Sequence, residues 1–422
     1  MQPVRNELMP GVWLTYVSAT KFKTGLLSMQ FVIPLQEQTA SLYALLPAVL
    51  RRGTVSYPTM ERLEGALDLL YGSRLDCTVR KKGENQCIGF VGSFIEDPYL
   101  PQGETLLEPM AQQMGELLLR PVTQDGCFLA EYVDSERDNL VDAIRSSLND
   151  KREYADMRLL QIMCADESYG IHRLGDERTA QTITGSMLYA HYQTLLETGQ
   201  LELFYSGSAP LERVQTALRE ALRALPRGSV LAPKRTQPGT PSSEPRFVTE
   251  RMEVTQAKLS MGLRCGSGNT AALSLCNAVF GGTSNSRLFL HVREKLSLCY
   301  FASSQYHRAK GLFTISSGID SKNYQTAFDE IMAQLSCIGR GELEEWELPV
   351  AKRSMMSAYQ TLGDSQGRTE DYYLGQAATG REETPEEQLR LLEAVTEDEV
   401  AEAARSIALD TVYFLTGKED AE

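Results

Sequence analysis

The sequence predicts an α+β fold of two homologous domains, each a mostly antiparallel sheet with helices packed on one face. Three observations lead to this prediction: the length of 422 residues, a repeated order of elements in the two halves, and a proline-rich break between them. At roughly 100–200 residues per domain, a chain of this length suggests at least two domains. Apolar residues make up 42% of the chain and charged residues 23%, so the composition is that of an ordinary globular protein.

The two halves share the same order of predicted elements. Each begins with an apolar strand containing Leu-Ser-Met, followed by an apolar helix, a hairpin with a glycine-containing polar turn, and a helix with apolar residues at three- and four-residue spacing. These segments are 27–29, 39–52, 75–95 and 103–121 in the first half and 259–261, 269–280, 298–319 and 323–341 in the second. We interpret the repeated order as an internal duplication of one α+β unit, with a chance similarity of two such halves as the alternative.

A linker is predicted between the halves. Residues 226–246 hold five prolines and several Ser, Gly and Thr, without helical or strand periodicity. The expected domains are therefore residues 1–225 and residues 247–422, with the degenerate motif described below in the first and an Arg/Tyr pair in the second.

Charge and cysteine usage exclude several classes of protein. Fifty-six acidic against 42 basic residues give a net charge of -14, which disfavours nucleic acid as a partner. The longest apolar stretches are about half the roughly 20 residues that cross a bilayer, so no membrane span is expected. The N-terminus lacks the pattern of a secretory signal, and eight scattered cysteines contain no C-x-x-C pair. These features favour buried free thiols and a cytoplasmic location.

A specific motif lies at residues 280–304, FGGTSNSRLFLHVREKLSLCYFASS. It contains a glycine turn, S-R-L-F, V-R-E-K and a tyrosine seven residues after the arginine. Together with weaker stretches in the same order along the chain, this motif resembles the insulinase-like zinc peptidases, the family of pitrilysin and the mitochondrial processing peptidase. The weaker stretches are Gly53-Thr54, Tyr57-Pro58, residues 169–175, Ala351-Lys352 and residues 394–417. The resemblance covers nearly the whole chain.

Active members of the family carry an H-x-x-E-H motif on a helix, in which two histidines bind zinc and the glutamate is the general base. The resemblance places the two histidines on Ala44 and Ala48, the glutamate on Pro47, and a distal glutamate ligand on Ala143. None of these side chains can bind a metal, and the first histidine of the chain is His172. We therefore expect no metal in this chain, and a dry plug of alanine methyl groups in place of the zinc pocket.

Other chemistry has little support in the sequence. The four histidines are never three or four residues apart, and no G-x-S-x-G motif is present for a nucleophilic serine. One further hypothesis is an independent metalloenzyme with unusual ligands. Stoichiometric zinc in the isolated protein would favour it.

The V-R-E-K motif implies that Arg293 and Tyr300 correspond to the two residues that stabilise the oxyanion in the family. Arginine is permanently cationic with forked donors, and tyrosine offers a neutral O–H. A chain that lacks the zinc ligands but keeps these donors is expected to present them to a zinc site on another chain. In the alternative, Arg293 forms a surface ion pair with Glu294, and Tyr300 only begins a strand.

Peptide binding is expected at two further places. The turn Gly281-Gly282-Thr283-Ser284 resembles a family loop that guides substrate, although the same residues suit a helix cap. An extended peptide generally adds to a sheet edge in this fold class, and residues 31–35 or their counterpart in the second half are candidates for that strand.

Within the family, the chain looks closest to a zinc-free bacterial branch of the type named as associated with elongation factor P modification and usually found with a zinc-bearing paralogue. The stretches Asn149-Asp150-Lys151 and Tyr154-Ala155 carry this resemblance, together with LYGSRLD and KKGE. It implies a non-catalytic subunit, inactive alone, that contributes substrate binding and oxyanion donors to a partner that holds the zinc and hydrolyses peptides. The alternative is a non-enzymatic scaffold or peptide-binding module. A homodimer of the isolated chain fits either reading.

Overall fold

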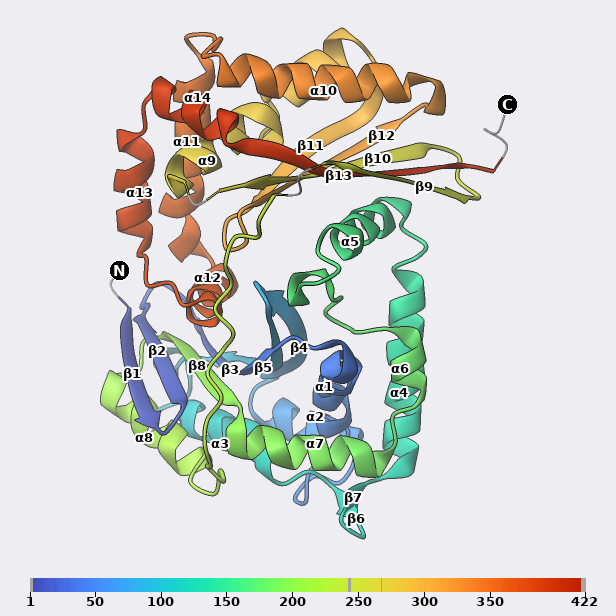
Figure 1. Ribbon diagram of the computed structural model, residues 1–422. Coiled ribbons are helices and arrows are strands. Elements are labelled where there is room, and N and C mark those ends of the chain that lie inside the picture. The colour runs from blue at the N-terminus through green and yellow to red at the C-terminus, as the bar shows by residue number, and fades with distance from the viewer. Residues whose placement is uncertain (1–2, 242–243, 267, 419–422) are drawn as a thin grey trace. The chain divides into compact units, whose positions relative to one another are not determined.

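The computed structural model describes residues 3–241, 244–266 and 268–418, and the chain folds into two compact units (Figure 1). Unit 1 comprises Met1–Arg145, Ile171–Arg235 and Gly363–Glu382, and unit 2 comprises Ser146–Gly170, Thr236–Leu362 and Glu383–Glu422. Neither unit is continuous in sequence, because each contains a short segment from the other half of the chain. Within the described residues, no helix is long and apolar enough to cross a membrane.

Unit 1 is built on a six-stranded sheet in which only β2 and β8 pair in parallel. In spatial order the strands are β1 (Val4–Met9), β2 (Val12–Ser18), β8 (Gln200–Gly207), β3 (Thr24–Pro34), β5 (Asn85–Ile95) and β4 (Arg74–Lys82). Met29 of β3 lies opposite Phe90 of β5 on one side and Leu203 of β8 on the other. The hairpin expected at residues 75–95 is confirmed as β4 and β5.

One face of this sheet carries the core of unit 1. Alternate residues of β3, such as Leu27 and Phe31, are buried in one apolar cluster with Leu45 of α1 and Met114 of α3, as the period-two pattern of a strand requires. The helices of unit 1 are α1 (Glu37–Leu50), α2 (Met60–Leu69), α3 (Leu107–Leu119), α4 (Ala130–Ser146), α6 (Glu177–Gln181), α7 (Gly185–Thr198), α8 (Leu211–Ala221) and α12 (Gln366–Thr379), and a small ribbon is formed by β6 (Thr123–Gln124) and β7 (Cys127–Phe128).

The opposite face of the same sheet is covered by α12, which comes from far along the chain. Leu374 and Ala378 pack on Val32 of β3 and Cys87 of β5, and all four side chains are buried. Figure 1 shows α12 on the side of the sheet away from α1 and α3. The sequence did not predict this second layer.

Unit 2 repeats the topology of unit 1 without the outermost strand. Its sheet has the order β11 (Cys299–His307), β12 (Leu312–Ile319), β10 (Ala257–Cys265), β13 (Ile407–Gly417) and β9 (Arg246–Met252). Again only one pair, β13 with β9, is parallel. The strands β4, β5, β3, β8 and β2 of unit 1 therefore correspond in order and direction to β11, β12, β10, β13 and β9. The predicted duplicated α+β fold is confirmed.

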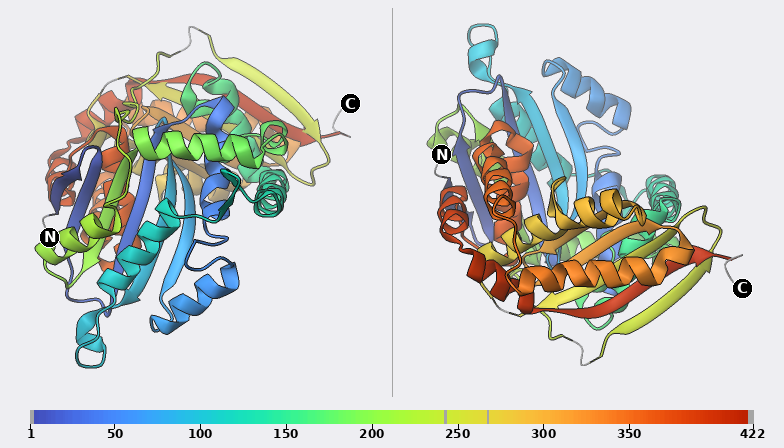
Figure 2. Two further views of the ribbon diagram at one scale, coloured as in Figure 1. Left: turned by 90° about the horizontal axis from the view of Figure 1, so that it is seen from below. Right: turned by 90° about the horizontal axis from the view of Figure 1, so that it is seen from above.

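The second sheet also has helices on both faces. Leu259, Met261 and Leu263 of β10 face one core, which α10 covers (Figure 2). On the other face α5 lies against β10, where Ser260 donates to Asp156 at 2.8 Å. The helices of unit 2 are α5 (Lys151–Met163), α9 (Thr270–Asn277), the π-helical η3 (Ala278–Gly282) and η4 (Leu288–Lys295), α10 (Tyr324–Gly339), α11 (Glu347–Gln360), α13 (Pro385–Ala394) and α14 (Glu397–Arg405). The 3-10 turns are η1 (Asp97–Tyr99) in unit 1, η2 (Ser168–Gly170) and η5 (Ser321–Asn323) in unit 2, and η6 (Leu362–Asp364) where the sequence passes from unit 2 to unit 1.

The first part of the predicted linker is held on unit 1. The guanidinium of Arg227 donates to three backbone carbonyls of that unit at 2.9 Å each. Lys234 is held twice, since its backbone N–H donates to Asn85 at 2.7 Å and its ammonium lies 2.6 Å from Glu84. Residues 242–243 of the linker lie outside the described residues. The chain up to residue 235 is therefore a fixed strap on its own unit, and the crossing to unit 2 follows it.

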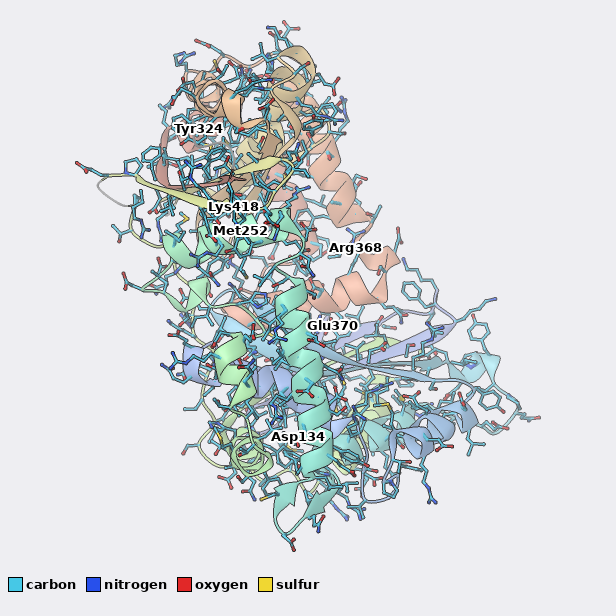
Figure 3. All side chains as sticks on the ribbon, turned by 90° about the vertical axis from the view of Figure 1, so that its right-hand side faces the viewer. Asp134, Met252, Tyr324, Arg368, Glu370 and Lys418 are labelled. Carbon is cyan, nitrogen blue, oxygen red and sulfur yellow. The ribbon has the colours of Figure 1, made fainter. Side chains whose placement is uncertain are left out.

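A buried ion pair holds α12 on its sheet. Glu370, labelled in Figure 3, is only 3% exposed and accepts from both terminal nitrogens of Arg80, at 2.6 and 2.7 Å. Its carboxylate also accepts from the hydroxyl of Ser28 at 2.8 Å. The sheet and the helix are thereby joined by three hydrogen bonds on one carboxylate.

We predict that Glu370→Ala destabilises unit 1 by about 2–3 kcal/mol, because it removes the buried partner of Arg80 and leaves only the more exposed Asp371, at 3.3 Å, as its counter-charge. The expected cost is below the 3–5 kcal/mol of a fully buried pair, since water reaches part of the guanidinium. A matched control is Lys21→Met, which removes the exposed Lys21–Asp364 pair and should cost less than about 1 kcal/mol. Equal shifts of the urea denaturation midpoint for the two variants would contradict the role of Glu370.

Candidate functional site

The positions that resemble the zinc motif lie on α1, which packs as an apolar helix. Ala44 and Pro47 are buried, and Ala48 is partly exposed. Proline has no N–H, so Pro47 cannot make the helical hydrogen bond to the carbonyl four residues before it. Its own carbonyl accepts from the thiol of Cys77 at 3.2 Å and from the backbone N–H of Arg51 at 3.1 Å. These side chains offer no atom that coordinates zinc, and the residues present do not fit this metal.

Ala143, the expected position of the distal ligand, is exposed on α4. The neighbouring carboxylate of Asp142 is 79% exposed. The prediction that Ala143 closes a dry plug together with Ala44 and Ala48 is therefore wrong. A sequence motif fixes a position along a helix, but the rotation of that helix about its axis depends on packing.

No alternative metal centre is present in the part of the chain that the structure describes: no group of three or more His, Cys, Asp and Glu side chains is placed to hold an ion. Two of the histidines have structural roles instead. His307 contacts the hydroxyl groups of Tyr169 and Thr314, each at 2.9 Å. Burial lowers the pKa of His172 to about 4, and its Nδ1 accepts from the backbone N–H of Leu174.

Three cysteines, of which Cys77 is partly and Cys87 and Cys276 are fully buried, are poor nucleophiles. Burial raises the pKa of Cys77, Cys87 and Cys276 to about 12 in each case. At neutral pH these groups are therefore thiols, whereas the reactive form of cysteine is the thiolate.

Arg293 lies in the last turn of η4 and is 42% exposed. Its Nε is 3.6 Å from a carboxylate oxygen of Glu294, and its guanidinium lies 4.7 Å from the centroid of the Phe289 ring. An exposed pair of this kind contributes at most about 1 kcal/mol. The surface ion pair with Glu294, stated above as the alternative, is therefore present, and it holds Arg293 only weakly.

Tyr300 projects from a bulge at the start of β11. Cys299 lies opposite Ile319 and Phe301 opposite Gly318, so Tyr300 has no partner in the ladder. Its side chain is 74% exposed. A β-bulge commonly redirects a side chain in this way.

A cavity of about 1020 Å³ lies beside Tyr300 in unit 2. Its lining includes Tyr300, Gln256, Asp320 and Lys418. Figure 3 labels Lys418 beside Met252, where β13 and β9 end together. Arg293 is not among the residues that line this cavity. The structure therefore does not bring the predicted Arg/Tyr pair into this cavity, and the pair's role in catalysis remains a prediction.

A strained turn separates Arg293 from Tyr300. Ser297 has a φ of 50°, in the left-handed region that a residue with a side chain rarely adopts. The backbone N–H of the next residue, Leu298, donates to the carbonyl of Val292 at 3.0 Å and closes the turn. This turn ends the π-helix and sends the chain into β11. π-helical turns are rare and often occur at functional sites.

The glycine turn is explained by close packing. A Cβ at Gly281 would lie 2.6 Å from the hydroxyl of Ser304 on β11, and one at Gly282 would lie 2.5 Å from the side chain of Asn277. Thr283 donates to the carbonyl of Ala278 at 3.1 Å, while Ser284 is exposed. Gly281 lets η3 approach β11, and Gly282 leaves room for the side chain of Asn277. The guidance of substrate by this turn remains a prediction.

Sequence reasoning missed the role of Arg287, the arginine of S-R-L-F. Its guanidinium is buried and binds both carboxylate oxygens of Glu347, at 2.7 and 2.6 Å. This pair ties η4 to the start of α11 and so positions the helix that carries Arg293. The available signal was an arginine directly before the apolar run Leu288-Phe289-Leu290.

The predicted edge strand was wrong. Residues 31–35 belong largely to β3, which lies between β8 and β5, and its counterpart β10 lies between β12 and β13. Both strands use their backbone groups on two sides, so neither can accept another strand. The sheet edges are β1 and β4 in unit 1 and β11 and β9 in unit 2. A buried apolar strand pattern indicates burial and not position within the sheet.

Comparison with known proteins identifies the family. The protein-family model described as "Peptidase M16 inactive domain" matches residues 182–355 of this chain. A probable inactive metalloprotease of Bacillus subtilis, YmfF, is 33% identical over 425 residues, covering 99% of each chain. The chain belongs to the peptidase M16 family. The insulinase-like resemblance of residues 280–304 is thus confirmed, and the chain is a homologue of an inactive metalloprotease.

Two other comparisons give a partial sequence relative and a full-length structural match of this M16 protein. An uncharacterized zinc protease of Bacillus subtilis, YmxG, is 29% identical over 175 residues, which is 39% of this chain and 42% of that protein. A crystal structure of a conserved protein from Enterococcus faecalis superimposes with a TM-score of 0.91 at 28% identity and covers 100% of both chains. The fold of the M16 protein is thus shared over its full length with a solved structure.

We predict that Cys77, Cys87 and Cys276 of the native protein react slowly with iodoacetamide at pH 8. Burial disfavours the thiolate and raises their pKa to about 12, so the thiolate fraction increases only as the pH approaches that value. Mass spectrometry of peptides from native and guanidinium-unfolded protein provides the comparison, because unfolding should make all three react. Rapid native alkylation of any of these three would contradict the prediction and reopen a nucleophilic role.

Proposed function

We propose that this M16 protein is a non-catalytic, zinc-free subunit that binds peptide and contributes donors to the active site of a zinc-bearing paralogue. One observation carries the proposal: the motif positions on α1 and α4 hold no metal-coordinating group, while Arg293 and Tyr300 both point to solvent. Donation to another chain requires that a side chain be accessible and free to leave its present contacts. Both side chains meet this requirement, because Arg293 has only a weak ion pair and Tyr300 stands on a bulge.

The relatives supply independent support for two chains with divided roles. Bacillus subtilis contains both a probable inactive metalloprotease and an uncharacterized zinc protease that resemble this chain. One organism therefore has two relatives of this chain with different descriptions. We infer that the present chain belongs with a zinc-bearing partner in the same manner.

In the proposed complex the chemistry would be divided between the chains. Zinc held by the partner would polarise the peptide carbonyl and activate a water molecule. Arg293 and Tyr300 would donate hydrogen bonds to the carbonyl oxygen as its negative charge develops. Arginine supplies a permanent charge, while the phenol supplies a neutral donor that strengthens as the charge forms. The π-helix and the Ser297 turn would fix the spacing of these two donors.

We predict that the chain alone hydrolyses no peptide, and that activity appears when it is mixed with the zinc-bearing paralogue of its own organism. In that mixture Arg293→Ala should lower kcat by about 10²–10³, because one oxyanion donor is lost. Tyr300→Phe should also lower kcat, because it removes the hydroxyl of the second donor. Cleavage of a fluorogenic peptide library by each chain and by the mixture measures these effects.

Arg340→Ala is the matched control, because Arg340 also forms an exposed ion pair in unit 2, with Glu342. It should leave the activity of the mixture unchanged. Full activity of the Arg293→Ala mixture would overturn the donor role. Homodimers that bind no paralogue, together with indifference to Tyr300→Phe, would favour the non-enzymatic scaffold or peptide-binding module.

A further inference from the structure

Two cations in unit 2 share one aromatic ring. The guanidinium carbon of Arg152 lies 4.2 Å from the centroid of the Phe301 ring, and Nζ of Lys258 lies 5.8 Å from the same centroid. The three side chains come from α5, β11 and β10. We call Arg152 and Lys258 the cation pair.

The sheet register builds this arrangement. Phe301 and Lys258 both lie opposite Gly318 of β12, so the three residues form one row across three strands. A Cβ at Gly318 would lie 2.5 Å from the Phe301 ring and 2.8 Å from Oε1 of Gln256. The absence of a side chain at Gly318 therefore lets the ring lie across β12 toward Lys258. The first turn of α5 then places Arg152 over the ring.

Both cations have only neutral hydrogen-bond partners. Arg152 donates to the hydroxyl of Ser303 at 3.1 Å, and Lys258 donates to Oε1 of Gln256 at 2.6 Å. Across the described ranges, neither forms an ion pair with a carboxylate. By contrast, three buried cations of the same unit, Arg264, Arg287 and Lys310, all pair with carboxylates.

Nearby carboxylates are committed elsewhere. Asp150 caps α5 by accepting from the backbone N–H groups of Arg152 and Glu153, and Asp156 accepts from Ser260. Burial lowers the pKa of Lys258, while the nearby charge of Asp150 raises it and that of Arg152 lowers it. The two like charges lie over one ring, and no carboxylate is hydrogen-bonded to either cation among the described residues. An anion bound between them would fill their remaining donor positions.

We propose that Arg152, Lys258 and Ser303 form a recognition site for a carboxylate carried by a peptide. The forked donors of a guanidinium match the two oxygens of a carboxylate, and such charge-assisted hydrogen bonds are about twice as strong as neutral ones. The carboxylate comes either from an acidic side chain or from the C-terminus of the peptide. Only the identification of the ligand as a peptide rests on the proposed function.

The cavity beside Tyr300 gives the peptide a place next to the cation pair. Gln256, which accepts from Lys258, also lines that cavity of about 1020 Å³. A peptide in the cavity therefore passes the side chain that holds Lys258. Arg152 and Lys258 select a carboxylate at this end of the peptide.

Fluorescence anisotropy with the full chain alone tests the proposal. Three labelled peptides of equal length serve as probes: one with two glutamates and an amidated C-terminus, one with glutamines and a free C-terminus, and one with glutamines and an amidated C-terminus. One of the two carboxylate peptides should bind at least about 10-fold more tightly than the neutral one, and which of them does so identifies the source of the carboxylate. Arg152→Gln and Lys258→Gln should each abolish that preference without changing the binding of the neutral peptide.

Lys151→Gln is the matched control, because it removes one positive charge at the adjacent position of α5, where Lys151 donates to the carbonyl of Leu148. It should retain the preference for a carboxylate. If Arg152→Gln or Lys258→Gln unfolds, Ser303→Ala provides a milder loss, with a preference reduced by about 3-fold or more.

Equal binding of all three peptides, no binding of any of them, or an unchanged preference in the Arg152→Gln and Lys258→Gln variants would overturn the proposal. The measurement involves neither the partner nor hydrolysis. A negative result would therefore overturn the carboxylate site only. The proposed function would still be tested by the experiment on the mixed chains.

Discussion

The structure depends on helices that cover both faces of each sheet. Each sheet presents apolar side chains on both faces and buried charged side chains on the second one. In unit 1 the second face presents Val32 and Cys87, and α12 covers them with Leu374 and Ala378. Exposing such a surface would cost roughly 25 cal/mol for each Å² of apolar area. The carboxylate of Glu370 adds a directional constraint, because it binds Arg80 and so fixes where the helix lies along the strands.

Unit 2 uses the same principle with stronger charge pairing. Arg264 on the second face of its sheet is 3% exposed and pairs with Asp410 at 3.0 Å and with Glu167 at 2.5 Å. Glu167 follows α5 in the chain, so the ion pairs anchor the segment that contains α5. A buried charge is tolerated only when it is paired and hydrogen-bonded. Each unit is thus completed by a segment whose neighbours in sequence belong to the other unit.

In unit 1, α1 is a packing element. Ala44 and Pro47 are buried, and neither side chain offers an atom that coordinates a metal. The side chains that carry the two proposals lie on unit 2. Arg293, Tyr300 and Arg152 are exposed or nearly half-exposed, and Lys258 is partly exposed, so the proposed roles require no unfolding to reach them.

The sequence by itself determined the duplicated α+β fold, the family, and the absence of ligands at the zinc motif, because these depend on local patterns: alternating apolar residues, turn glycines, and the identity of single side chains at Ala44 and Ala48. Tertiary structure alone decided that Ala143 faces solvent, that β3 and β10 are interior strands, and that α5 and α12 cover second faces. Each of these depends on helix rotation, strand order or contacts between residues far apart in the chain. Such features are fixed by the packing of the whole unit, and a local pattern contains no information about them.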